Sequence, residues 1–283
     1  MKDTSKKLSG QEGFESYYRE IYGKRWEDIK KSFYTENQSV KFQINDNLKP
    51  YFLDFASVYA AACLPLDNAE KIADLCAAPG GKTLILAHRM REDANLSSNE
   101  RSGERKHRLQ TVVSECLSED IQKRILVSCS DAATWCKRQT ECFDSILLDA
   151  PCSSERHVFL DPKYLNSWSP SRIKTVSMEQ WALLSSAYRL LKPEGYLLYS
   201  TCAISPEEND LMIEKLFKKF NKNNDAFEII EAKPDFSSLE KCLPLKNLEA
   251  ENTKYGKEIF PDKMEGAGPL YFCLIKKKKS VLI

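Results

Sequence analysis

From residue 71 onward, short apolar runs alternate with longer segments of helical periodicity, and this alternation is the feature that most constrains the fold. The apolar runs that we interpret as strands cover 72–75, 93–96, 125–128, 145–149 and 196–200. The helical segments between them begin at Thr83 and cover 104–117 and 172–191. Strands that alternate with helices are typical of a doubly wound sheet, because each crossover helix returns the chain for a parallel strand. We therefore predict an α/β fold with a mostly parallel sheet and helices on both faces.

The residues that precede this alternation are predicted from their own patterns. Aromatic and apolar residues at spacings of three and four indicate an amphipathic helix over 14–33. We expect its apolar face to pack on the core, with an RNA-stacking surface as the alternative. Polar residues 35–50 indicate a linker, and a helix is expected over 51–64. We divide the chain into a helical N-terminal extension, 1–50, and a main domain, 51–283.

The C-terminal part contains one clear helix signal followed by less regular sequence. Ser205-Pro206-Glu207-Glu208 matches a capping box with proline at the first helical position, so a helix is predicted from there to about residue 220. Beyond it we expect a surface region with one strand near 227–230, and then a closing strand over 269–275.

Composition limits the class of protein. The 283 residues are 42% apolar, enough for one large core, and they contain no secretory signal and no apolar run of about 18 residues, so we expect an intracellular protein without a membrane span. Ten cysteines with only three histidines and no CxxC pair argue against a disulfide framework and against zinc or another metal. Eight cysteines are expected to be buried and inert: Cys63, Cys76, Cys116, Cys129, Cys136, Cys142, Cys242 and Cys273. The net charge of +1 gives no bulk argument for nucleic acid.

The segment ADLCAAPGGKT consists of a strand, a loop of small residues and a helix start. Gly80 and Gly81 let the backbone approach a ligand closely, and the N-terminus of the helix favours a carboxylate or a phosphate. A P-loop would need glycine where Cys76 stands, so the motif of an NTPase is not matched. An acid after the next strand often holds a ribose, which makes Glu100 a candidate. Asp131 fits a contact to the base of the same ligand and a plain helix cap equally well.

Two cysteines follow two of the predicted strands. DSILLDAPCSSER places Asp149 and Cys152 after one strand, and Cys202 follows the next. Because the carboxyl ends of parallel strands share one edge, the acid and both thiols should meet beside the glycine loop. A thiolate that adds to carbon 6 of cytosine makes carbon 5 nucleophilic toward an electrophilic methyl group. A carboxylate at Asp149 would accept a hydrogen bond from the cytosine amine, and a helix that starts at Pro206 would favour the Cys202 thiolate.

Three motifs, DLCAAPGGKT, LLDAPCSSER and YSTCAISPEEN, occur in this order. Together they resemble the S-adenosylmethionine-binding loop and the two cysteine motifs of the Sun (Nop/Sun) family of RNA 5-methylcytosine methyltransferases. The resemblance covers 51–220 and, more weakly, the tail. SSERH, GPLYFC and the short aromatic N-terminal helix are similar to the compact branch of the family, which modifies mitochondrial rRNA and tRNA and lacks a PUA-type domain.

The resemblance implies a Rossmann-like S-adenosylmethionine-dependent methyltransferase fold and a role for each motif residue. The family's nucleophile falls on Cys202, its release cysteine on Cys152 and its base-contacting acid on Asp149. The implied cofactor contacts are Cys76, Ala77, Ala78, Pro79, Gly80, Gly81, Lys82, Glu100, Asp131 and Asp149. Glu100 stands where aspartate is frequent in the family. The implied reaction is methylation of cytosine carbon 5 in rRNA or tRNA through a Cys202 adduct that is resolved with Cys152.

Two other functions remain as alternatives, an RNA-binding assembly factor with little activity and a DNA cytosine methyltransferase, in which the nucleophile would be Cys152. We expect RNA as the partner, with a protein partner that supplies RNA affinity, a monomeric chain and a cytoplasmic location, or an organellar one if a transit peptide is missing. Local positive charge should meet the RNA. The residues concerned are Arg101, Arg105, Lys106, Arg108, Arg156, His157, Lys276, Lys277, Lys278 and Lys279.

Overall fold

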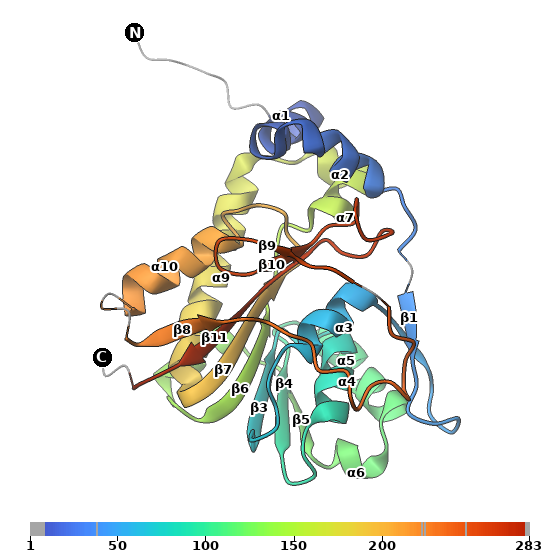
Figure 1. The fold of residues 1–283 in the computed structure, drawn as a ribbon, viewed down its shortest axis with the longest axis vertical. Coiled ribbons are helices and arrows are strands. Elements are labelled where there is room, and N and C mark those ends of the chain that lie inside the picture. The colour runs from blue at the N-terminus through green and yellow to red at the C-terminus, as the bar shows by residue number, and fades with distance from the viewer. Residues whose placement is uncertain (1–8, 38, 222, 224, 247, 281–283) are drawn as a thin grey trace.

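The computed structural model describes residues 9–37, 39–221, 223, 225–246 and 248–280. Within these residues a nine-stranded sheet forms the centre of the molecule (Figure 1), with strand order β5-β4-β3-β6-β7-β11-β10-β9 and with β8 paired to β11.

One half of the sheet is parallel. It contains β3 (Lys71–Leu75), β4 (Asn95–Asn99), β5 (Ile125–Ser128), β6 (Phe143–Asp149) and β7 (Leu191–Thr201). The chain first moves outward from β3 to β4 and β5, and then returns to place β6 and β7 on the other side of β3. The doubly wound α/β prediction is therefore confirmed, and the reversal of strand order lies between β3 and β6, where folds of this kind bind ligands.

The other half of the sheet is antiparallel. β11 (Leu270–Lys277) pairs with β7, and it also carries β8 (Phe227–Ile230) and β10 (Lys257–Ile259), while β9 (Glu251–Asn252) pairs with β10. The predicted strands near 227–230 and 269–275 are confirmed. β9 and β10 were not predicted, because they are short and polar and are held as strands by their pairing rather than by an apolar pattern.

Helices cover both faces of the sheet (Figure 1). On one face lie α3 (Phe55–Ala62), α4 (Gly81–Arg89), α5 (Gly103–Cys116) and the short α6 (Glu119–Gln122); on the other lie η2 (Ala132–Lys137), α9 (Pro170–Leu190) and α10 (Asp210–Phe220). Successive strand residues face opposite layers: Ile72 packs in the first apolar cluster and Ala73 in the second. Both layers bury their apolar residues against the sheet, which fixes the positions of the strand ends.

The N-terminal segment packs against the short helices that follow β6. It forms α1 (Gly10–Tyr22), η1 (Gly23–Arg25) and α2 (Trp26–Ser32), which lie against α7 (Glu155–Leu160) and α8 (Pro162–Asn166). The aromatic side chains at this contact are Phe14, Tyr18, Trp26, Phe33, Phe159 and Trp168. Most of them are fully buried. The prediction that the apolar face of the segment 14–33 packs on the core is therefore correct for these residues.

Three local predictions were wrong. Residues 39–42 of the predicted linker form β1 (Ser39–Phe42), which pairs with β2 (Tyr51–Asp54) because Val40 and Phe42 alternate inward. The helix expected from residue 51 starts only at α3, where Asp54 accepts a hydrogen bond from the N–H of Ala56. The expected burial fails for four of the eight cysteines, because Cys129 is exposed and Cys76, Cys136 and Cys142 are only partly buried. The pairing of β1 with β2 joins segments on both sides of residue 50, and the division of the chain at that point stays a prediction.

Candidate functional site

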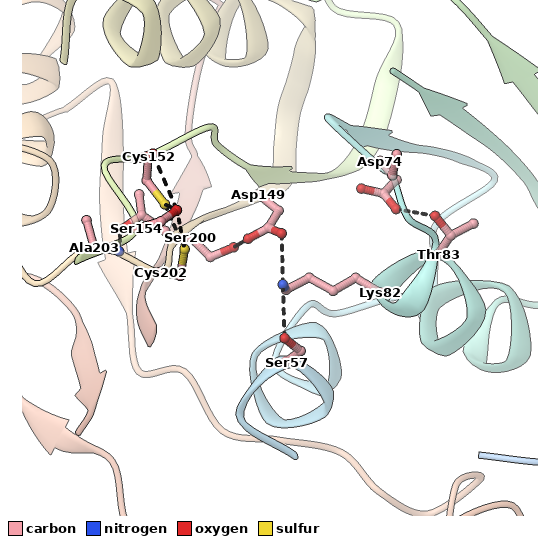
Figure 2. Close-up of polar contacts among 12 residues, drawn as sticks. Ser57, Asp74, Lys82, Thr83, Asp149, Cys152, Ser154, Ser200, Cys202 and Ala203 are labelled. Atoms are coloured by element: carbon pink, nitrogen blue, oxygen red, sulfur yellow. Dashed lines mark hydrogen bonds and ion pairs between the residues drawn. The ribbon is translucent and has the colours of Figure 1, made fainter. Parts of the chain in front are cut away.

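Three loops meet at the carboxyl edge of the parallel strands. They are the β3–α4 loop with the glycine pair, the β6–α7 loop with Cys152, and the β7–α10 loop with Cys202. Asp149 at the end of β6 pairs in register with Ser200 near the end of β7, which places the two cysteine loops side by side (Figure 2). The prediction that strand ends gather these side chains at one edge is confirmed.

The two thiols are in direct contact. Cys152 Sγ lies 2.8 Å from Cys202 Sγ, and the Ser154 hydroxyl lies 3.3 Å from Cys202 Sγ (Figure 2). The hydrogen bond from Cys152 lowers the pKa of Cys202, and Ser154 adds to this effect against burial. The same bond and burial raise the pKa of Cys152. Of the two thiols, Cys202 is therefore the one that ionises more readily, and Cys152 is placed to donate a hydrogen bond to its sulfur.

The expected helix N-terminus beside Cys202 is absent at Pro206. Residues 206–209 form a turn, and α10 begins at Asp210. The capping-box prediction fails because Glu208 is fully buried and accepts a hydrogen bond from the backbone N–H of Ser153, 2.9 Å away, instead of capping a helix. The hydrogen bonds of Cys152 and Ser154 therefore replace a helix dipole as the support for the Cys202 thiolate.

Asp149 lies between a hydroxyl and a cation. Its Oδ1 accepts a hydrogen bond from Ser200 Oγ at 2.8 Å, and its Oδ2 accepts one from Lys82 Nζ at 2.8 Å (Figure 2). Lys82 also donates to Ser57 Oγ at 3.2 Å. Burial acts to lower the pKa of Lys82, but Asp149 and the nearby Cys202 more than offset this, and the pKa is raised. Lys82 is thus a positive charge held against Asp149, and it also interacts with the sulfur of Cys202.

The ion pair of Lys82 with Asp149 was not predicted. The sequence placed Lys82 among the residues of a cofactor loop, but its side chain extends from α4 toward the end of β6. Ser57 lies in α3, Lys82 in α4 and Ser200 in β7. Because these elements are far apart in the sequence, no local motif could indicate that the three side chains meet at Asp149.

A cavity of about 500 Å³ opens beside the sulfur of Cys202. Its lining includes Ser57, Lys82, Asp149, Ser154, His157 and Cys202. Such a volume accommodates a nucleobase with part of its sugar. The thiol of Cys202, the carboxylate of Asp149 and the ammonium group of Lys82 therefore line one space.

Two smaller cavities flank the glycine loop. One, of about 210 Å³, lies between β2 and the loop and includes Asp74, Lys82 and Asp149 in its lining. The other, of about 50 Å³, is lined by Cys76, Glu100 and Asp131 among others. Gly80 has φ +120°, a conformation that an L side chain rarely adopts, so the loop between the two cavities needs glycine at this position. The predicted loop residues, Glu100 and Asp131 are therefore together in one region.

Buried carboxyl oxygens without a hydrogen-bond partner mark both small cavities. Asp74 is fully buried, and Thr83 Oγ1 donates to its Oδ2 at 2.6 Å, but its Oδ1 has no partner among the described residues. Burial raises the pKa of Asp74 to about 7, although Thr83 acts in the opposite direction. Glu100 is 3% exposed; its Oε2 is 3.2 Å from Arg105 Nη1, yet without hydrogen-bond geometry. A ligand with an ammonium group and ribose hydroxyls would satisfy both acids.

Asp74 and Asp131 need separate comment. Asp74 was not predicted as a site residue, although an acid inside the otherwise apolar strand before the glycine loop was a signal for it. Asp131 caps η2, where its carboxylate accepts a hydrogen bond from the N–H of Ala133 at 3.0 Å, and it also lines the smaller cavity. The structure thus supports the cap and leaves a ligand contact open to the same side chain.

Several of the basic residues expected to meet RNA have structural roles. Arg156 donates to four backbone carbonyls, those of Phe33, Thr35, Gly266 and Gly268. The side chains of residues 276–279 form ion pairs with Glu194, Glu141, Glu228 and Asp225. Since Tyr271 of β11 pairs with Thr201 and Lys276 pairs with Tyr196, these lysines lie toward the end of the sheet opposite the cysteines. Arg101, Arg105 and His157 lie near the described cavities.

The described part of the chain offers neither a cluster of metal ligands nor a membrane-spanning helix. It contains no group of three or more histidine, cysteine, aspartate or glutamate side chains that could hold a metal ion. Within the same residues, no helix has the length and apolar character needed to cross a membrane.

Comparison with known proteins identifies related sequences. The family profile of 16S rRNA methyltransferase RsmB/F matches residues 61–264. The 5-cytosine rRNA methyltransferase NSUN4 of Mus musculus is 30% identical over 80% of this chain and 60% of its own length. Ribosomal RNA small subunit methyltransferase F of Escherichia fergusonii is 33% identical over 68% of this chain and 39% of its own length. The chain therefore spans less than two thirds of the length of these curated relatives.

A solved structure shares the fold. The crystal structure of NSun6 from Pyrococcus horikoshii with SFG superposes with a TM-score of 0.65, over 83% of this chain and 55% of that one, at 21% identity. The likeness covers most of the chain, and it places the chain among proteins of the predicted Rossmann-like fold.

Proposed function

Because the chain belongs to the RsmB/F family of 16S rRNA methyltransferases, we propose that it transfers a methyl group from S-adenosylmethionine to carbon 5 of a cytosine in RNA, through a covalent Cys202 adduct that is resolved with Cys152. Relatives named as cytosine or ribosomal RNA methyltransferases support this reaction. The observation that carries the proposal is the 2.8 Å contact of the two sulfurs at the edge of the cavity lined by Asp149 and Lys82.

The first step of the proposed mechanism is addition of the Cys202 thiolate to carbon 6, which forms an S–C bond and moves the ring electrons toward carbon 5 and N3. Asp149 holds the cytosine through the N4 amine, a contact that uracil does not offer. Lys82, 2.8 Å from Asp149, offsets negative charge that develops on the ring. The cofactor, when bound, would supply an electrophilic methyl group to carbon 5, and its sulfur would keep the electrons of the methyl–sulfur bond that breaks.

The second step releases the methylated base. With Cys202 bonded to carbon 6, Cys152 gives up its own proton to solvent, and the resulting thiolate accepts the carbon 5 proton. The electrons of that C–H bond re-form the carbon 5–carbon 6 double bond, and Cys202 leaves as a thiolate. Once Cys202 is bonded to carbon 6 it no longer accepts a hydrogen bond from Cys152, so the sulfur of Cys152 is free to turn toward the base. Without Cys152, addition and methyl transfer should still proceed, and the adduct should persist.

The residues that flank the glycine loop fit the cofactor. The partnerless Oδ1 of Asp74 supplies a negative charge for an ammonium group, and Glu100 supplies acceptors for ribose hydroxyls. Residues 76–79 and Gly81 line the cavity that contains Asp74, and Asp131 lines the smaller cavity together with Glu100. These residues bind and orient the cofactor, while Asp149 and Lys82 stand where its cavity meets that of the base.

The RNA itself is proposed to be rRNA, by analogy with the named relatives, with tRNA as the second candidate. Arg101 and Arg105 line the smaller cavity on the cofactor side, where they also pair with Glu179 and Glu100, and His157 lines the base cavity. Their position beside the site supports these side chains as contacts to RNA phosphates or bases. A protein partner for RNA affinity, a monomeric state, the helical extension over 1–50 and a cytoplasmic or organellar location stay predictions.

The test is transfer of a labelled methyl group to RNA. Wild-type protein with labelled S-adenosylmethionine should place label on 5-methylcytosine in rRNA, and Cys202→Ala should place none. Bisulfite mapping of RNA from cells that lack the gene then identifies the cytosine. Cofactor binding without any methyl transfer would favour the assembly factor, and transfer to DNA but not RNA would favour the DNA methyltransferase.

A further inference from the structure

Two buried glutamates lie behind the cysteine loops. Glu155 and Glu208 are both fully buried. Glu155 begins α7, three residues after Cys152, and Glu208 lies in the turn that follows Cys202. The hydrogen bonds that the structure gives them come from neutral donors, which are hydroxyl, amide and backbone N–H groups. A buried pair of carboxyl groups held in this way cannot easily carry two negative charges.

The hydroxyl of Ser153 connects the two carboxyl groups. Ser153 Oγ is 2.7 Å from Glu155 Oε1 and also makes a short contact with Glu208 Oε1. A hydroxyl group has one proton and can donate to only one of these oxygens. If both glutamates were ionised, the other contact would bring two lone pairs together. The geometry therefore requires one more proton, carried by a carboxyl group of the pair.

The surrounding donors assign that proton to Glu208. Glu155 already accepts from Tyr18 at 2.6 Å on Oε1 and from the N–H of Ile204 at 3.1 Å on Oε2, so it is surrounded as a carboxylate is. Glu208 accepts on Oε2, from the N–H of Ser153 and from Gln180 Nε2. Among the described residues, its Oε1 has a hydrogen-bond contact only with the Ser153 hydroxyl. The Glu208 carboxylic acid thus donates to Ser153, and Ser153 donates to the Glu155 carboxylate.

Titratable neighbours also oppose a second negative charge. The groups that interact with the pair from the surrounding elements are Tyr17, Tyr18, Tyr22, Cys152, Tyr199 and Cys202. All of them are neutral or negative. Burial, followed by the charge of Glu155, raises the pKa of Glu208 to about 8, and burial also raises the pKa of Glu155. The shared proton is therefore retained at neutral pH.

These bonds join three segments of the chain. Tyr18 belongs to α1, Ser153 lies next to Cys152, and Ile204 lies two residues after Cys202. We propose that Glu155 and Glu208 are positioning residues, and that the one proton they share through Ser153 holds Cys152 against Cys202. This role deepens the proposed methyl transfer and rests on it. Loss of the proton would place two carboxylates on one serine hydroxyl, and the resulting repulsion would separate the loops and the sulfurs.

The experiment measures the distance between the thiols without RNA. Dibromobimane links two cysteines that lie close together, and mass spectrometry quantifies the Cys152–Cys202 product in the full chain. Glu208→Gln mimics the protonated acid, because its amide donates to Ser153 and accepts on the other side. It should match wild type at pH 7 and give about tenfold more linked product than wild type at pH 9, where about nine in ten wild-type pairs have lost the proton.

Glu155→Gln is the discriminating partner variant. The three donors to Glu155 are Tyr18, Ser153 and the N–H of Ile204, and the amide of the variant must turn its own N–H toward at least one of them. The yield of linked product and the rate of methyl transfer should therefore both fall about tenfold at pH 7, while Glu208→Gln keeps both. Glu207→Gln, one residue away in the same turn, is the control and should behave as wild type. If Glu155→Gln does not fold, Tyr18→Phe replaces it: removing one donor from the carboxylate should move the wild-type decline to higher pH.

The outcomes separate the two proposals. The shared proton would be overturned if wild type and Glu208→Gln gave the same amount of linked product at every pH. It would also be overturned if Glu155→Gln kept linkage and methyl transfer while Glu208→Gln lost them. The predicted linkage profile in a protein that methylates no RNA would support the proton and reject the methyltransferase.

Discussion

Asp74→Asn tests whether the buried acid beneath the glycine loop is held for a ligand at the expense of stability. Asp74 is fully buried, has one hydrogen bond, from Thr83, and leaves Oδ1 without a partner among the described residues. Burial raises its pKa from 3.8 to about 7. The folded state therefore binds this proton more tightly than the unfolded chain, and the free energy of unfolding falls as pH rises from 3.8 to about 7.

The size of the effect follows from the two pKa values. At about 1.4 kcal/mol for each tenfold change in proton affinity, ionising Asp74 above pH 7 costs the folded state about 4 kcal/mol. About 2.5 kcal/mol of this cost accumulates between pH 5 and pH 8. Asparagine cannot ionise, so Asp74→Asn should avoid the cost, and it should lose about tenfold in affinity for S-adenosylmethionine because its ammonium group loses a negative partner.

The assay is urea unfolding of wild type and Asp74→Asn at pH 5 and pH 8, with cofactor affinity measured by calorimetry. The difference in unfolding free energy between the two proteins should grow by about 2.5 kcal/mol from pH 5 to pH 8, in favour of the variant. Asp67→Asn at the surface is the control and should change stability by less than about 0.5 kcal/mol at both pH values. A difference that does not depend on pH, or a variant with unchanged cofactor affinity, would refute the reasoning.

Three further substitutions test other parts of the site. Lys82→Met should lower the rate of methyl transfer by about 10²- to 10³-fold, because Asp149 and Cys202 lose their cation. RNA affinity, measured by fluorescence anisotropy, should stay within twofold of wild type, and a fully active variant would reject the role of Lys82. Replacement of Lys276, Lys278 and Lys279 by alanine should leave RNA affinity unchanged at low and high salt, because these lysines form ion pairs far from the cysteines. A weaker dependence of RNA affinity on salt in the variant would show that these lysines contact RNA. Arg156→Ala should lower the free energy of unfolding, measured in urea, by about 3 kcal/mol because four carbonyls lose their donor. Arg156→Lys should recover little of this loss. An unchanged free energy of unfolding in Arg156→Ala would show that these hydrogen bonds add no stability.

The sequence predicted the features that depend on strand order. Asp149, Cys152 and Cys202 each follow an apolar run, and parallel strands bring such ends to one edge whatever the loops do. The glycine loop was identifiable for a different local reason. Its paired glycines indicate a backbone conformation that other residues avoid, and Gly80 adopts such a conformation. The core of the site could therefore be located from short local motifs.

Features that depend on side-chain direction or on distant pairing were not predicted. Glu208 matched a helix cap in the sequence, but Ser153, 55 residues earlier, draws it into the interior, and the helix starts later as a result. Lys82 looked like part of a cofactor loop until α4 directed it at Asp149. β1 lies in a polar segment and becomes a strand only through pairing with β2. In each case, a contact between remote segments outweighs the local pattern.

The most direct test of the proposed mechanism is the site of the covalent bond to RNA. Cys152→Ala, incubated with S-adenosylmethionine and substrate RNA, should accumulate a protein–RNA adduct that mass spectrometry places on the peptide containing Cys202, with the methyl group already on the cytosine. Wild type should turn over without accumulating it, and Cys202→Ala should form none. An adduct on Cys152, or full turnover by Cys202→Ala, would contradict the assignment of Cys202 as nucleophile and Cys152 as the residue that releases the product.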